Sequence, residues 1–77
     1  MTYRALDVVV VKADLPKHGL RRGNLGTVVE TYQPDGLEVE FTAASGRTTA
    51  LVTLSESAVR AVCDDDLVTV RTVTGAA

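Results

Sequence analysis

The sequence predicts an all-β fold, a small barrel of about five short strands, and three observations support this. The apolar residues are mostly Val, Leu and Ala, with two tyrosines, one phenylalanine and no tryptophan. β-Branched valine packs well on a pleated sheet, so its abundance favours strands. Apolar and polar residues alternate along residues 37–43, the period of a half-buried strand. Glycine and proline separate short apolar runs, as in small β folds.

A chain of 77 residues is predicted to form a single domain, spanning residues 1–77. A domain of this size buries only about 60% of the surface of its unfolded chain, so we expect modest stability. We place the barrel core at about residues 6–62. An extra strand or arm is expected at residues 67–73, where apolar residues alternate again, and a frayed tail at residues 74–77.

The first strand is predicted at Asp7–Lys12, where four consecutive valines leave both faces apolar. Residues 13–24 then form a loop that contains one proline and two glycines. This loop is longer than most connections in compact domains, and such loops often bind partners. The second strand is predicted at Leu25–Gln33, with Gly26 near its start, where a missing side chain permits a bulge or a close backbone approach.

A Pro-Asp-Gly turn at residues 34–36 predicts a hairpin into a third strand at Leu37–Ala43. After a Ser-Gly turn, the fourth strand is predicted at Arg47–Leu54, and its alternation places Leu51 on the outer face. Residues 55–57 suit only a short 3₁₀ turn. A short fifth strand is predicted at Val59–Val62.

Five strands, a long first loop and a single helical turn before the fifth strand resemble the SH3-like barrels. More closely, the segments LDVVVVKADLPKHGLRRGNLGTVVE, PDGLEVEF, SGRTTALVTL and AVRAV resemble a bacterial family known as domain of unknown function 4926. The resemblance spans most of the chain. It implies a small SH3-like barrel and supplies no established activity. Members of that family often have aspartate at the position of Asn24.

Residues 23–28 also resemble, more loosely, the KOW motif of ribosomal and transcription proteins. That resemblance implies contacts with RNA or protein through the loop residues Lys17, Arg21 and Arg22. The net charge of −2 argues against nucleic acid, whose binders carry a basic face. No aromatic side chain that could stack on a base lies near the loop. We therefore favour an acidic protein surface as the loop's partner and keep nucleic acid as the alternative.

The sequence predicts no catalytic residue, no metal, no cofactor and no small-molecule ligand. His18 is the only histidine, and nothing in the sequence brings a nucleophile and an orienting group to it. Cys63 is the only cysteine, so it offers neither an internal disulfide nor a zinc site, and it favours a reducing cytoplasm. The acidic run at residues 64–66 lacks the spacing of a calcium loop. The N-terminal residues show no apolar run typical of a signal peptide or a membrane helix.

Surplus apolar surface is the strongest functional signal, and it has two interpretations. In the first interpretation, the arm at residues 67–73 folds back over the first strand and covers it. In the second, the apolar strands bind a partner or a second copy of the chain by strand pairing. We expect a non-enzymatic protein-interaction or accessory module, more specifically the small antitoxin-like member of a two-protein pair. The alternative is an RNA- or ribosome-associated module. The candidate partner-binding residues are Asp14, Leu15, Lys17, His18, Leu20, Arg21, Arg22 and Leu51.

Overall fold

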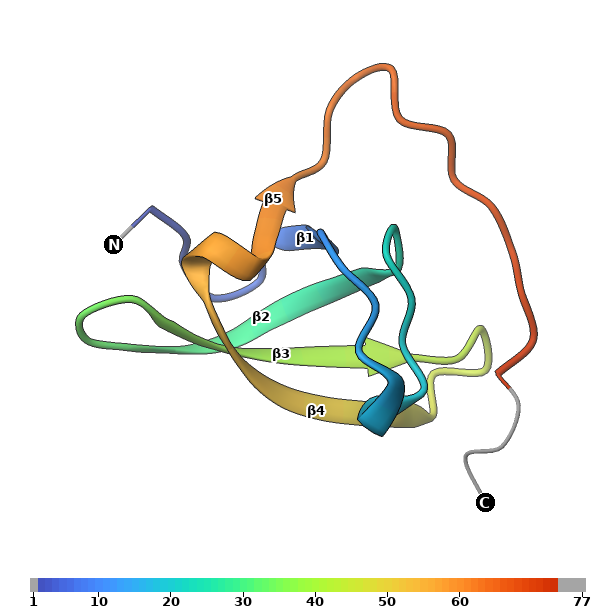
Figure 1. Ribbon diagram of the computed structural model, residues 1–77, viewed down its shortest axis with the longest axis horizontal. Coiled ribbons are helices and arrows are strands. Elements are labelled where there is room, and N and C mark those ends of the chain that lie inside the picture. Colours follow the sequence, from blue (N-terminus) through green and yellow to red (C-terminus); the bar gives the residue numbers. More distant parts are fainter. Residues whose placement is uncertain (1, 74–77) are drawn as a thin grey trace.

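The computed structural model describes residues 2–73 and contains a single antiparallel sheet of five strands in the order β4-β3-β2-β1-β5. The predicted all-β class is confirmed, and the sheet curls in the manner of a small barrel (Figure 1). The two helical elements are 3₁₀ turns, η1 (Pro16–His18) and η2 (Glu56–Ala58). The strands are β1 (Val8–Val11), β2 (Leu25–Tyr32), β3 (Gly36–Thr42), β4 (Thr48–Ser55) and β5 (Val59–Ala61).

The core lies on the concave side of the sheet and is built almost entirely from valine and leucine. β3 shows the predicted alternation, with Leu37, Val39 and Phe41 buried between more exposed polar residues. Among the described residues, no polar or charged side chain is fully buried. The buried cluster consists of Val9, Val11, Leu20, Val28, Leu37, Val39, Phe41, Val52 and Val59.

Gly26 allows β2 to pack tightly against the core. It pairs with Val9 of β1. A Cβ atom added at Gly26 would lie 2.6 Å from Cγ1 of Val39 and 2.7 Å from Cε1 of Phe41. The close approach predicted for this glycine is therefore confirmed, whereas the shift in strand register occurs further along β2, between Val28 and Glu30.

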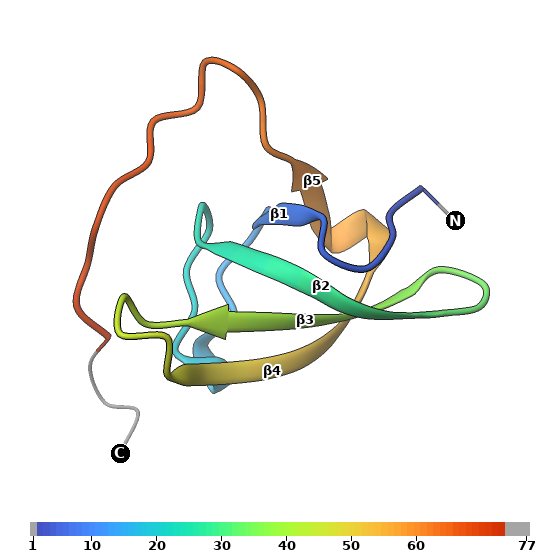
Figure 2. The ribbon, with the colours of Figure 1, turned by 180° about the vertical axis from the view of Figure 1, so that it is seen from behind.

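Of the two alternatives predicted for residues 67–73, a strand or an arm, the structure has the arm. Residues 62–73 leave β5 and loop away from the sheet without joining it (Figures 1 and 2). Leu67, Val68 and Val70 are 90%, 74% and 97% exposed, so they do not cover β1. Alternation suits a strand, but a strand also needs a free edge beside it, and this segment lies along none. The predicted frayed tail at residues 74–77 lies outside the described residues.

Candidate functional site

The long loop between β1 and β2 is an ordered hairpin. Leu15 and Leu20 exchange two backbone hydrogen bonds, 2.9 Å from the Leu15 amide and 3.2 Å from the Leu20 amide. The turn η1 lies between them and ends at Gly19, which has a φ of 68°. This left-handed conformation costs glycine little, so the hairpin can reverse there. The ordered backbone gives the loop's side chains fixed positions.

Two polar side chains hold the return half of the hairpin. The Arg22 amide donates to Oδ1 of Asp14 at 2.8 Å, and the Arg21 amide donates to Oδ1 of Asn24 at 2.8 Å. Asp14, a predicted partner-binding residue, therefore uses one carboxylate oxygen inside its own loop. Both acceptors bond backbone N–H groups that no strand pairs, which stabilises the hairpin.

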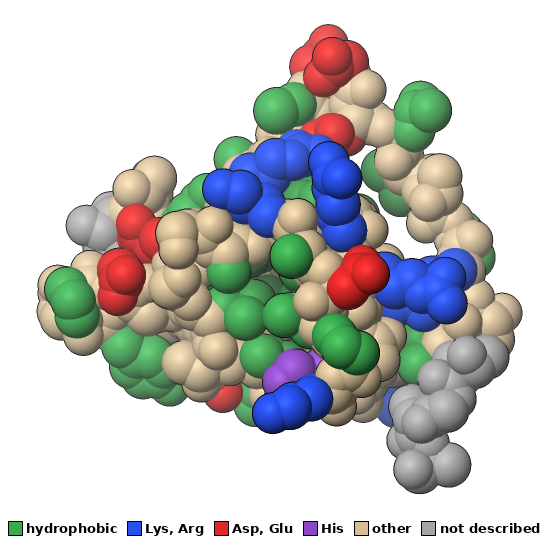
Figure 3. Space-filling view, in the orientation of Figure 1, with side chains coloured by type: hydrophobic (Ala, Val, Ile, Leu, Met, Phe, Trp, Pro, Cys, Tyr) green, Lys and Arg blue, Asp and Glu red, His purple; other side chains and the backbone are tan. Residues whose placement is uncertain are grey.

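The predicted binding residues of the loop divide into exposed and buried ones. The charged residues Lys17, Arg21 and Arg22 are exposed, as is His18. On the face shown in Figure 3, lysine and arginine side chains form separate groups with apolar surface between them. Such an arrangement differs from the continuous basic stripe typical of a surface that follows a nucleic-acid backbone.

Leu20, another predicted partner-binding residue, lies largely in the core and reaches the surface only at the edge of the loop. Its side chain is 5% exposed and belongs to the core cluster, because the hairpin folds its apolar tip onto the open end of the barrel. Leu15 is half-buried and packs against the same cluster. These two leucines therefore fix the loop to the barrel, and the loop's exposed side chains remain the candidates for binding.

Arg71 reaches the loop from the C-terminal arm, and the sequence analysis did not select it. Its Nη2 donates to the carbonyl oxygen of Gly19 at 2.8 Å and to Oδ1 of Asn24 at 2.6 Å. Only one feature of the sequence could have drawn attention to Arg71: it is the single charged residue in the alternating run from residue 67 to residue 73. Its loop partners, about fifty residues earlier in the chain, could not be inferred from that run.

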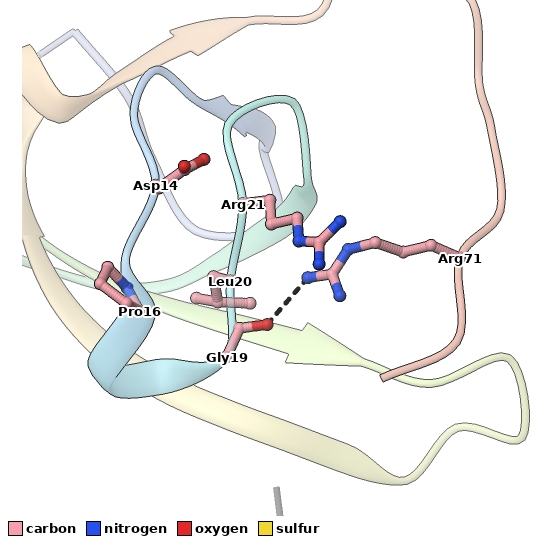
Figure 4. A pocket seen from close by; sticks show the side chains of 6 residues that line it. All are labelled: Asp14, Pro16, Gly19, Leu20, Arg21 and Arg71. Carbon is pink, nitrogen blue, oxygen red and sulfur yellow. Dashed lines mark hydrogen bonds between the residues drawn. The ribbon is translucent and has the colours of Figure 1, made fainter. Parts of the chain in front are cut away.

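A shallow pocket of about 190 Å³ lies where Arg71 meets the loop. In Figure 4 the guanidinium groups of Arg71 and Arg21 lie close together and point toward one another. The lining residues are Asp14, Pro16, Gly19, Leu20, Arg21 and Arg71. The pocket therefore combines two cationic groups, one carboxylate and a small apolar floor.

A second exposed surface lies along β4, at one edge of the sheet. Leu51 faces outward as predicted, is 56% exposed, and pairs in register with Glu40 of β3. Within residues 2–73, the backbone of β4 forms hydrogen bonds to no element other than β3. One side of the β4 backbone is therefore open to solvent or to a partner.

Acidic residues gather on the outer face of the sheet beside β4. Glu30 and Glu38 oppose each other across β2 and β3, and Glu40 lies on the same face two residues from Glu38. The hydroxyl of Thr53 donates to Glu38 at 2.6 Å, and the hydroxyl of Thr48 donates to Glu40. The strand geometry and these threonine contacts explain why the carboxylates are here: they form the polar face of a half-buried sheet.

An ion pair anchors the start of the C-terminal arm. Nη2 of Arg60 lies 2.8 Å from Oδ1 of Asp66, and Nη1 lies 2.9 Å from Oδ2. The Arg60 hydrogen bonds, followed by one from the Cys63 amide, lower the pKa of Asp66 to about 2. The acidic run at residues 64–66 thus contains one carboxylate with a structural role. Cys63 is an exposed free thiol.

Replacing Arg60 by glutamine is expected to raise the pKa of Asp66 toward its ordinary value. Because the folded-state pKa is below the unfolded one, this pair's stabilisation is complete above about pH 4 and is lost as the pH falls through about 2. NMR titration of the Asp66 carboxyl carbon measures the midpoint. Arg47→Gln, an exposed arginine outside the pair, is the matched control. An unchanged midpoint in Arg60→Gln would show that Arg60 does not hold the carboxylate in its charged form.

Two other kinds of site are absent from the described part of the chain. No group of three or more histidine, cysteine, aspartate or glutamate side chains is arranged to hold a metal ion. No helix between residues 2 and 73 is long and apolar enough to span a membrane.

The sequence resemblance is supported by a match to a protein family, Domain of unknown function (DUF4926), over residues 5–61. The matched region begins just before β1 and ends with β5, so it contains the whole sheet and excludes the arm that carries Arg71. No curated protein and no solved structure matches the chain. The match covers most of the 77 residues, and the chain belongs to the DUF4926 family.

Proposed function

We propose that this domain is a non-enzymatic protein-interaction module of the bacterial cytoplasm, and that its partner adds a strand to the edge of β4. The observation that carries the proposal is an eight-residue edge strand without a single charged residue, proline or glycine. Natural sheets usually protect such an edge with lysine, proline, a bulge or a covering loop. β4 has a register shift against β3 near its start, opposite Phe41 and Thr42, and residues 50–55 beyond it form a regular edge that suits a partner strand.

Strand addition would use two features of β4. The open backbone groups of Thr48–Ser55 provide main-chain hydrogen bonds, the usual source of affinity in this binding mode. Leu51, near the middle of the strand, provides an exposed apolar side chain for a pocket on the partner. The neighbouring carboxylates of Glu38 and Glu40 would disfavour a partner with acidic groups opposite them.

A narrower form of the proposal is that the domain is the antitoxin-like member of a two-protein pair. A small domain has a small core, and this one leaves Leu51, Val68 and Val70 in solvent. Permanent cover by a partner would remove that apolar surface from water.

RNA or ribosome binding through the loop remains the second candidate, because Lys17, Arg21 and Arg22 are exposed there. Phosphate contacts release counterions, so such binding weakens steeply with salt, whereas an apolar strand interface changes little. Alanine at these three positions would reduce nucleic-acid retention and leave a β4-bound protein in place.

Leu51→Lys is expected to leave the domain folded and to abolish capture of its protein partner. An exposed substitution changes stability by roughly 0.5 kcal/mol or less, whereas a lysine at position 51 would place a charged ammonium group in the apolar pocket of the partner, which cannot solvate it. The measurement is affinity capture from native lysate at moderate salt, with thermal unfolding of each variant. Val68→Lys, on the exposed arm, is the matched control. Equal recovery of one stoichiometric protein by wild type and Leu51→Lys would exclude the β4 edge as its binding site.

A further inference from the structure

We propose that the pocket between the loop and the C-terminal arm binds a carboxylate side chain, an aspartate or glutamate of the partner polypeptide, between Arg21 and Arg71. This inference rests on the proposed function, since it assigns the partner a chemical group. It adds a second contact, distinct from the β4 edge.

The first argument is the number of free donors in the pocket. A guanidinium group carries five N–H donors and accepts none. Arg71 uses Nη2 on Gly19 and Asn24, while its Nε is buried and has no hydrogen-bond partner among the described residues. The guanidinium of Arg21 likewise makes no hydrogen bond to a described residue and points toward Arg71 (Figure 4). Because buried donors are normally satisfied, this site has capacity for an acceptor.

The second argument is charge. Two guanidinium groups that face each other repel, and Asp14 is the one carboxylate on the pocket wall. Oδ1 of Asp14 already accepts from the Arg22 amide. The two arginines and Asp14 leave one positive charge, which a single monoanion would neutralise. A phosphate dianion would leave the pocket with one excess negative charge, whereas a carboxylate leaves it neutral.

The third argument is shape. A carboxylate is planar and matches the fork of an arginine with two parallel hydrogen bonds. The methylene groups of a glutamate or aspartate side chain can lie on the apolar floor formed by Pro16 and Leu20. No aromatic side chain lines the pocket, so a stacked nucleotide base would gain little there. These features together favour an acidic peptide side chain.

A ligand in this pocket would also affect the arm. Arg71 is the arm residue that hydrogen-bonds to the loop, through Gly19 and Asn24. A carboxylate shared by Arg21 and Arg71 would connect loop and arm a second time. Ligand binding is therefore expected to slow amide hydrogen exchange in residues 67–73.

The test is an NMR titration of the isolated 77-residue chain with N-acetyl-glutamate methylamide, compared with the neutral N-acetyl-glutamine methylamide. The glutamate probe is expected to shift the Arg71 Nε–H and Gly19 amide signals saturably at millimolar concentration. The glutamine probe should bind at least about tenfold more weakly, because it lacks the charge that strengthens hydrogen bonds. Arg21→Gln and Arg71→Gln should each weaken the glutamate response, whereas Arg47→Gln should not.

Three results would overturn the proposal: an equal response to both probes, no response up to about 50 mM glutamate probe, or inorganic phosphate binding more than about tenfold tighter than the glutamate probe. The last would make this a phosphate site. The titration contains no partner protein, so its failure leaves the β4 proposal standing. Conversely, partner capture that survives Leu51→Lys would exclude the β4 edge without affecting the titration result.

Discussion

Replacing Gly26 by valine is expected to remove most of the stability of the domain. Even a single added Cβ at this position would lie 2.6 Å from Val39 and 2.7 Å from Phe41. Both neighbours are buried in the core, so they have little room to move. Inserting groups into a well-packed core costs about 1–3 kcal/mol and sometimes more. A chain of this length has a total stability of roughly 4–12 kcal/mol.

Urea unfolding followed by circular dichroism measures this effect. We expect Gly26→Val to lose more than about 3 kcal/mol and Gly26→Ala to lose about 1–3 kcal/mol, since alanine adds the clashing Cβ alone. Gly23→Ala is the matched control. Gly23 has open space around it and a φ of 92°, so alanine there tests backbone strain without a clash. Equal midpoints for Gly26→Val and wild type would show that β2 can move away from the core at this point.

The sequence predicted the features of this fold that depend on local pattern. Alternation in residues 37–43 identified the buried face of β3, and the position of Gly26 identified the close approach. Leu51 was correctly placed on the outer face, because strand period alone determines which side a residue occupies. These predictions succeed because side-chain direction in a strand follows from the sequence itself.

The features that the sequence missed depend on contacts between distant residues. The arm has the alternation of a strand, yet it lies along no sheet edge, so its pattern alone could not decide between a strand and an arm. Leu20 was assigned to a binding surface because nothing in the loop's sequence shows that the hairpin folds onto the core. The pocket was missed because Arg71 and Gly19 are 52 residues apart in the chain.

Leu37→Ala is expected to produce the second-largest loss of stability. Leu37 is fully buried, and it is opposed by Leu54 on β4. Truncating a buried leucine to alanine costs about 2–5 kcal/mol, which combines lost burial with the cavity left behind. The upper part of that range would leave a domain of this size partly unfolded at room temperature.

Leu51→Ala removes the same atoms on the neighbouring strand, which makes it a matched control. Because Leu51 is 56% exposed, its truncation should cost less than about 1 kcal/mol in the isolated domain. Differential scanning calorimetry of both variants should therefore show a large loss of melting temperature for Leu37→Ala and a small one for Leu51→Ala. A large loss in Leu51→Ala would mean that self-association already covers the β4 edge in solution. The difference between the two leucines thus separates the surface that holds the barrel together from the surface that remains available to a partner.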